Sequence, residues 1–412
     1  MPQIPIDFVL FALTLAGVAL FHHHTLKVAA SGLAVITVYK LLYSPFREGA
    51  GFAGLATHLG HEWVIIVNLG LLLTGFALLA RHFEESGVPE ALPKVLPPGW
   101  IGGFSLLCLV FVLSSFLDNI AAALIGATVA KIVFPKVHVG YLAAIVACAN
   151  AGGAGSVVGD TTTTMMWIDG VSPFDVTHAY LAAVPALLVV GLVAARQQHS
   201  YAAMHAASDV AHPIDWGRLG VVAILLLAAL ATNLGVNAAA PELANHFPIL
   251  GAALWGALLA TSGARRPDWG ALPSALTGSV FLLSLVLAAS MMPVERLPPA
   301  SWVTSLSLGF VSAVFDNIPL TALALRQGGY DWGVLAYAVG YGGSMVWFGS
   351  SAGVAVTNVF PHAKSVGQWV RHGWHVGVAY VVGFAVIILL WGWHPQEPHR
   401  PPPAGAAAVE AH

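Results

Sequence analysis

Residues 114–120 of the chain read Ser-Ser-Phe-Leu-Asp-Asn-Ile, and residues 312–318 read Ser-Ala-Val-Phe-Asp-Asn-Ile. The aspartates of the two copies, Asp118 and Asp316, are 198 positions apart (316 − 118). A second pair of stretches follows at a spacing of 190 (342 − 152): Gly152-Gly153 with Gly159-Asp160-Thr161, and Gly342-Gly343 with Gly349-Ser350-Ser351. Two patterns in the same order at nearly constant spacing indicate an internal repeat.

The composition places the chain in a membrane. Its 412 residues are 58% hydrophobic and 8% charged, whereas soluble domains are about 45–50% apolar and about 25% charged. A soluble enzyme domain and a disordered chain are therefore excluded, and an all-α polytopic membrane protein surrounded by lipid is predicted. The net charge of −3 gives no sign of a nucleic-acid partner. Cys108 and Cys148 lie in apolar runs, so no disulfide framework is expected.

Apolar runs long enough for membrane helices recur along the chain. The predicted spans are approximately 4–21, 25–43, 62–81, 139–167, 176–195, 219–236, 247–263, 271–292, 330–360 and 373–393. Two further apolar stretches, 100–133 and 300–327, carry the Asp-Asn pairs near their middles. Because Asp-Asn favours turns and irregular backbone is tolerated at membrane depth where it lines a cavity, we expect a re-entrant helical hairpin in each rather than one long helix.

The basic residues predict the orientation. If each hairpin enters and leaves the membrane on the same side, 11 of the 16 Lys and Arg residues fall on one face of the membrane. We expect that face to be cytoplasmic and the N-terminus to lie outside. Five spans then separate the two Asp-Asn pairs, so the repeats have opposite topology, as in secondary transporters with broken helices. We expect scaffold helices in 1–93, a first transport repeat in 94–197, a loop and scaffold helices in 198–292, an inverted second repeat in 293–394 and a disordered tail in 395–412.

Three acidic residues stand inside the apolar runs. Asp118, Asp160 and Asp316 would each cost roughly 2.5–3.5 kcal/mol at a helix centre if uncompensated, and no Lys or Arg lies within these motifs to pair with them. They therefore need protons or bound cations, although a protonated, structural hydrogen-bonding role remains the alternative. Neutral oxygen donors surround them, and such ligands suit hard cations such as Na⁺ or Li⁺ rather than a transition metal. The supporting ligands expected are Asn119, Asn317, Thr161, Thr162, Ser350, Ser351, Ser114 and Ser312, and the helix-breaking glycines are Gly152, Gly153, Gly159, Gly342, Gly343 and Gly349.

Two enzyme-like patterns carry little weight. Gly349-Ser-Ser-Ala-Gly353 matches a serine nucleophile elbow, but that motif needs a strand–turn–helix context. Gly159-Asp160 is reminiscent of intramembrane aspartyl proteases, whose Gly-x-Gly-Asp would require glycine where Val157 stands. We therefore expect a transporter without a resident cofactor and not an enzyme.

Several motifs resemble the NhaD family of sodium/proton antiporters, within the ion-transporter superfamily. They are Ser-Phe-Leu-Asp-Asn at 115–119, Asn-Ala-Gly-Gly at 150–153, Gly-Asp-Thr-Thr-Thr-Thr-Met at 159–165, Phe-Asp-Asn-Ile-Pro at 315–319 and Gly-Ser-Ser-Ala-Gly at 349–353, with Phe-His-His-His-Thr-Leu-Lys at 21–27. One departure is the stretch before Gly159, where Gly155 and Val157-Val158 replace an expected aromatic residue and proline.

The resemblance implies a two-hairpin inverted-repeat fold, a homodimer and elevator-type alternating access. It also implies that cytoplasmic Na⁺ or Li⁺ is exchanged for external H⁺ at the three aspartates. We expect a bacterial inner (cytoplasmic) membrane, because the sequence shows no organelle transit segment. A cation-coupled carboxylate or oxyanion transporter on the same fold is the alternative. Relatives of that kind carry Ser-Asn-Thr at the hairpin tips, where this chain has Asp-Asn.

Overall fold

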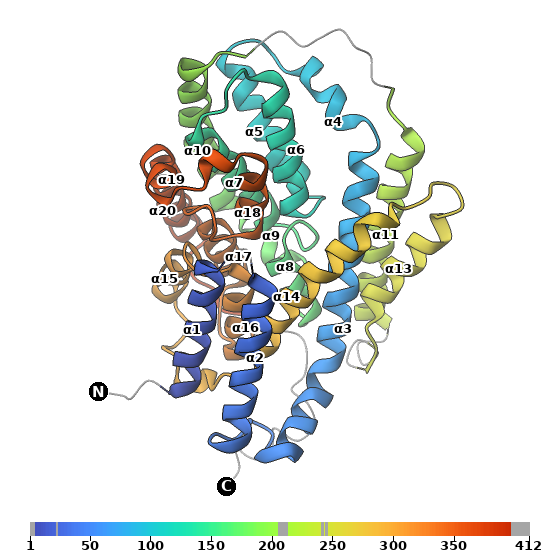
Figure 1. Cartoon of the computed structure of the whole chain (residues 1–412), viewed down its shortest axis with the longest axis vertical. Coiled ribbons are helices and arrows are strands. Elements are labelled where there is room, and N and C mark those ends of the chain that lie inside the picture. The colour runs from blue at the N-terminus through green and yellow to red at the C-terminus, as the bar shows by residue number, and fades with distance from the viewer. Residues whose placement is uncertain (1–4, 22–23, 205–212, 240–242, 244–245, 397–412) are drawn as a thin grey trace.

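A computed structural model describes the chain except residues 1–4, 22–23, 205–212, 240–242, 244–245 and 397–412. Most of the predicted tail therefore lies outside the described residues. Within them the protein is built of helices joined by short connections, without a β-strand (Figure 1). Among the described residues, four helical segments are long and apolar enough to cross a membrane alone: Thr25–Leu42, Gly51–Glu84, Phe174–Tyr201 and Trp269–Ser290. A fifth is obtained if α19 (Val366–His372) and α20 (Trp374–Leu390), which meet at 60°, are counted together. The fold class is thus an all-helical polytopic membrane protein.

One group of helices packs around the long helix α3 (Gly51–Glu84). It contacts α11 (Trp216–Ala239), α13 (Ile249–Thr261) and α14 (Leu272–Ser290), and α14 in turn contacts α2 (Thr25–Leu42). In Figure 1, α14 runs obliquely across α3. The remaining member, α1 (Ile6–Leu20), packs on α2.

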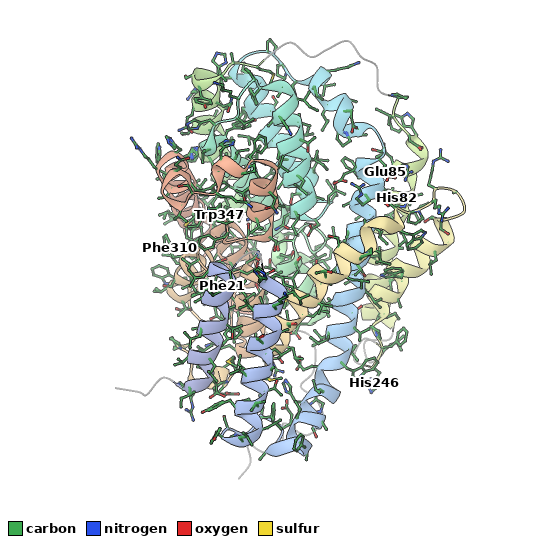
Figure 2. The ribbon with its side chains drawn as sticks, viewed as in Figure 1. Phe21, His82, Glu85, His246, Phe310 and Trp347 are labelled. Carbon is green, nitrogen blue, oxygen red and sulfur yellow. The ribbon has the colours of Figure 1, made fainter. Side chains whose placement is uncertain are left out.

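The helix that contains the predicted span 62–81 is longer than that span, because α3 begins eleven residues earlier (62 − 51). The polar side chains in its first turns are paired, which removes the reason to end the helix there. Glu62 pairs with Arg326, and His58 bonds Ser290 Oγ at 2.9 Å and Glu48 Oε2 at 3.0 Å. At the other end of α3, His82 and Glu85 meet Arg218 of α11, whose guanidinium is 2.7 Å from the Glu85 carboxylate (Figure 2).

Both Asp-Asn stretches break their helices at the predicted place. α5 (Trp100–Ser114) ends before the first pair and α6 (Asn119–Val133) begins with its asparagine. α15 (Trp302–Ser312) and α16 (Asn317–Gln327) repeat this arrangement in the second half. α5 and α6 pack against each other, so the chain turns back at the first break, whereas α15 and α16 have few contacts with each other.

The predicted spans 139–167 and 330–360 are interrupted at their glycine clusters. The first consists of α7 (Val139–Ala154) and α8 (Thr161–Ile168), and the second of α17 (Trp332–Gly342) and α18 (Ser351–Val359). α7 contacts α17, while α6 packs on α18 and α16 packs on α8. The second helix of each hairpin therefore rests on the distal piece of the other half's broken helix.

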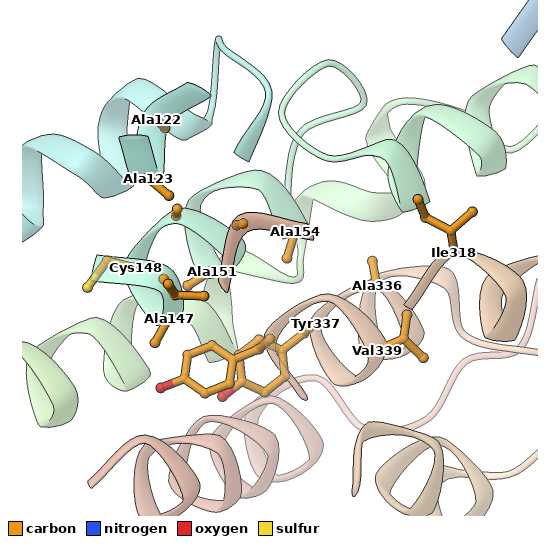
Figure 3. Packing of buried hydrophobic residues seen from close by; sticks show 14 of the residues in the cluster. Ala122, Ala123, Ala147, Cys148, Ala151, Ala154, Ile318, Ala336, Tyr337 and Val339 are labelled. Atoms are coloured by element: carbon orange, nitrogen blue, oxygen red, sulfur yellow. The ribbon is translucent and has the colours of Figure 1, made fainter. Parts of the chain in front are cut away.

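The broken helices form the centre of the protein. Every residue of α7 and of α17 is buried, and α7 consists largely of alanine and glycine, which allow close helix approach. The stack of Tyr337, Tyr341 and Tyr380 fills the space between α17 and α20. Figure 3 shows small side chains of α7, Ala147 and Ala151 among them, beside Tyr337. α10 (Tyr180–Tyr201) covers α7 and α20.

Shorter elements connect these helices. They are α4 (Val88–Ala91), η1 (Leu92–Val95), α9 (Phe174–Thr177), η2 (Trp269–Ala271), η3 (Val294–Arg296) and η4 (Pro361–Ala363).

Candidate functional site

Asp160 lies at the break between α7 and α8 and is 1% exposed. Its carboxylate caps the first turn of α8. Oδ1 accepts hydrogen bonds from the backbone N–H of Thr162 at 2.8 Å and from its hydroxyl at 2.9 Å, and Oδ2 accepts one from Asn119 Nδ2 at 3.0 Å. All three donors are neutral, so the described residues hold this buried carboxylate by hydrogen bonds and place no basic side chain on it.

A chain of carboxamides and hydroxyls connects Asp160 to the second half. Asn119 also donates to Asn150 Oδ1 at 3.0 Å, and Asn150 Nδ2 donates to Ser344 Oγ at 2.9 Å and to Ser350 Oγ at 3.2 Å. Asn150 and Ser344 were not among the predicted site residues. The available signal was a single carboxamide within the otherwise apolar stretch of α7, whose neighbours cannot be read from spacing alone.

The two hairpin aspartates cap their helices in the same way. Asp118 Oδ2 accepts from Ile120 N at 3.1 Å, and Asp316 Oδ1 accepts from Ile318 N at 3.0 Å. Ser351 Oγ lies 3.4 Å from the second oxygen of Asp316. Both carboxylates are half-buried and close enough to Asp160 for mutual electrostatic repulsion, so the three predicted aspartates are brought into one region.

Of the other predicted ligands, some lie at the N-termini of the helices that surround the site, and others do not. Ser350 caps α18, and Thr161 and Asn317 are buried in the first turns of α8 and α16. In contrast, the Ser312 hydroxyl donates to the carbonyl of Val339 at 2.7 Å, which fastens α15 to α17. The buried Ser114 hydroxyl has no hydrogen-bond partner among the residues that the structure describes.

The predicted glycines lie where two backbones touch. A Cβ at Gly152 would collide with the carbonyl of Phe111 in α5, and one at Gly342 would collide with the carbonyl of Gly309 in α15. A Cβ at Gly159 would meet the Ser114 carbonyl. A Cβ built at Gly153 or at Gly349 would lie 2.5 Å from a backbone oxygen, and one built at Gly343 would lie 2.7 Å from a backbone oxygen. Gly152, Gly159, Gly342 and Gly349 therefore let α5 or α15 and the residues that follow lie directly against the broken helix of the same half. Gly153 and Gly343 instead allow the chain after each break to fold back closely on the helix that precedes it.

Four helix N-termini converge on this region. The capping residues Asp118, Asp160, Asp316 and Ser350 precede α6, α8, α16 and α18. A helix N-terminus carries a partial positive charge of about half an elementary charge, which stabilises a carboxylate placed on it. This backbone contribution takes the place of the basic side chain that other buried acids have.

Those other acids were not predicted to be buried. Asp331 caps α17, is fully buried and lies 2.6 Å from His178 Nε2. Asp7 is 3.5 Å from the ammonium of Lys40, and both are buried. The prediction that acidic residues inside the apolar segments are restricted to the three site aspartates is therefore incomplete. The distinction that holds, over the described part of the chain, is that these two have basic partners and the three site aspartates do not.

No protein-family model matches the chain. It is similar to two curated proteins of Arabidopsis thaliana. It is 27% identical over 334 residues to Sodium/proton antiporter 1, covering 70% of this chain and 55% of the relative. It is 26% identical over 331 residues to Sodium/proton antiporter 2, covering 69% of this chain and 76% of the relative. The chain thus spans little more than half the length of the first relative.

Proposed function

We propose that the protein is a secondary transporter of the NhaD type that exchanges cytoplasmic Na⁺ or Li⁺ for external H⁺ at Asp118, Asp160 and Asp316. The observation that carries the proposal is Asp160: a fully buried carboxylate, hydrogen-bonded to neutral donors and linked through Asn119 and Asn150 to the other half of the protein. The names of the two relatives support sodium/proton exchange.

The charge balance of the site favours a cation. Three ionised carboxylates contribute −3, and four helix N-termini of about +0.5 each contribute about +2, which leaves a net charge of about −1. One proton or one monovalent cation would neutralise it. Since an uncompensated charge is costly inside the membrane, the site can change its exposure from one side to the other most readily when either ion is bound.

Competition between the two ions would couple their movements. A cation bound at a carboxylate oxygen lowers the proton affinity of that carboxylate, and a proton removes the charge that attracts the cation. If the site moves between two orientations only when neutralised, each cation carried one way is replaced by protons carried the other way. The hairpins and broken helices are the parts we expect to move, in an elevator-type step against the α3 group of helices.

Three further features belong to the proposal. We infer that the repeats are inverted and that the hairpins are re-entrant; the matching contacts of α6 with α18 and of α16 with α8 support this inference. We also expect a homodimer, and a bacterial inner membrane with the N-terminus outside.

A cation-coupled carboxylate or oxyanion carrier is the competing function. It would need a neutral or positive centre, because helix N-termini that face an open site attract anions. Here three of the four N-termini are already occupied by aspartate side chains. The geometry therefore favours a cation.

The test is dequenching of a ΔpH-sensitive dye in everted membrane vesicles after addition of NaCl, LiCl, KCl or citrate. We expect a response to Na⁺ or Li⁺ that disappears in Asp160→Asn and persists in the control Glu90→Gln, an exposed acidic residue outside the site. Uptake of citrate without any cation-driven proton movement would replace the proposal with the anion carrier.

A further inference from the structure

Gly340 is a fully buried residue of α17 that faces the site from the second half. At the repeat spacing of 190 it occupies the position that corresponds to Asn150 in α7 (340 − 190). The two helices cross here, and the first half supplies a carboxamide where the second half supplies no side chain at all.

Packing does not require glycine at position 340. A Cβ built there would be 3.4 Å from Asp160 Oδ2 and 4.0 Å from both Ala154 Cβ and the Asn150 carbonyl oxygen, which are ordinary van der Waals separations. This separates Gly340 from Gly152 and Gly342, where a Cβ would collide with backbone. Glycine is also a weaker helix former than alanine, so neither packing nor helix formation gives a reason for it.

The oxygen atoms around this position give the reason. Asp160 Oδ1 already accepts two hydrogen bonds from Thr162, whereas Oδ2 accepts one, from Asn119, in the part of the chain that the structure describes. A carboxylate oxygen can accept a second bond, and Oδ2 is the atom nearest to the Cβ position of Gly340. The carbonyl oxygen of Asn150 borders the same space. A carboxylate and a carbonyl oxygen beside a space for one small atom form a ligand set for a hard cation.

We propose that Gly340 sets the size of the cation that Asp160 accepts: the space left by its missing side chain admits Na⁺, and a methyl group there would shift the preference toward the smaller Li⁺. This inference rests on the proposed cation exchange and adds a selectivity-determining residue to it. Gly340 contributes no ligand, and its role is to leave the free side of Asp160 Oδ2 accessible.

The experiment compares the wild type, Gly340→Ala and the control Gly377→Ala in everted vesicles. Gly377 lies in α20, is only partly buried, and its Cβ position has no heavy atom within 4 Å, so it controls for a glycine-to-alanine change within a helix away from the site. The quantities measured are the NaCl and LiCl concentrations that give half-maximal dequenching. We expect Gly340→Ala to raise the value for Na⁺ by about tenfold, the lower end of what one extra methyl group costs in a binding pocket, with a smaller rise for Li⁺.

A second measurement separates ion binding from folding. The melting temperature of the detergent-solubilised protein is recorded without added Na⁺ or Li⁺ and then with each. We expect Gly340→Ala to melt at or above the wild-type temperature without these ions and to lose the stabilisation by Na⁺ more than that by Li⁺. An equal change for both ions, or no change for either, would overturn the role of Gly340 while leaving exchange intact. A wild type that responds to neither ion would overturn the exchange function itself.

Discussion

At the break in the first half, Asp160 caps α8 and four threonines follow it; at the matching break in the second half, Ser350 caps α18 and is followed by serine, alanine and glycine. The two breaks share a close backbone contact, since Gly152 lies against a carbonyl of α5 and Gly342 against a carbonyl of α15. The charge is not the same, since only the first break carries a carboxylate. Both halves of the protein therefore have the same kind of helix break, whereas the proposed ion chemistry is concentrated at the break of the first half.

The largest difference between the halves is expected at the capping residues. Asp160→Asn should abolish cation-driven dequenching, because the amide cannot exchange a proton for a cation. Ser350→Ala should leave measurable exchange, since it removes one hydroxyl and a 3.2 Å hydrogen bond to Asn150. The comparison breaks down if both variants lose exchange equally at wild-type protein levels.

Substitutions at the break glycines should affect the halves alike. Gly152→Ala and Gly342→Ala each force a methyl group onto a backbone carbonyl, and overpacking of this kind costs about 1–3 kcal/mol. Thermal unfolding in detergent should give lower melting temperatures for both, while Gly256→Ala, whose Cβ position has no neighbour within 4 Å, should melt like the wild type. Unequal losses at 152 and 342 would mean that the two backbones are not equivalent.

Substitution of Asn150 should break the chain of hydrogen bonds that connects the two halves. Asn150→Ala removes the hydrogen bonds to Asn119, Ser344 and Ser350, and leaving buried polar groups unpaired costs about 1–3 kcal/mol. We expect the Na⁺ concentration for half-maximal dequenching to rise about tenfold, which corresponds to about 1.4 kcal/mol. Cys148→Ala in the same buried helix is the control, and a similar rise there would assign the effect to packing.

The smallest effect is expected at the far ends of the hairpins. Arg326, in the last turn of α16, pairs with Glu62 of α3, whereas Lys131, in the last turn of α6, is exposed. Arg326→Gln should change the exchange rate by about two- to threefold, because the amide can still donate a hydrogen bond to the Glu62 carboxylate and only the charge of the donor is lost, and Lys131→Gln should not change it. The exchanged pair Glu62→Arg with Arg326→Glu should return the rate to that of the wild type; failure to do so would assign the effect to the arginine side chain itself.

The sequence was sufficient where local chemistry decides structure. Asp-Asn and the glycine clusters marked the helix breaks, because a capping carboxylate and a missing Cβ act within a few residues of their own position. The start of α3 could not be predicted in this way. The polar residues at 58 and 62 read as a membrane boundary, and only the distant partners Ser290 and Arg326 explain why the helix continues through them.

The site itself was predictable in its charges and not in its connections. Repetition identified Asp118 and Asp316, and the Gly-Asp pattern identified Asp160. Asn150 and Ser344 depend on the crossing of α7 and α17, which brings residues 194 positions apart (344 − 150) into hydrogen-bonding distance. The burial of Asp331 was missed for a similar reason, since its partner His178 lies in the other half of the chain.

The four helix ends at the site have a consequence for how such a protein can change. Their positive character belongs to the backbone and survives any substitution, whereas the negative charge belongs to three side chains. With neutral residues at 118, 160 and 316, the same arrangement would carry about +2 instead of about −1 and would attract oxyanions. Whether the site attracts a cation or an anion therefore depends on three side chains, whereas the arrangement of helices would suit an ion of either charge.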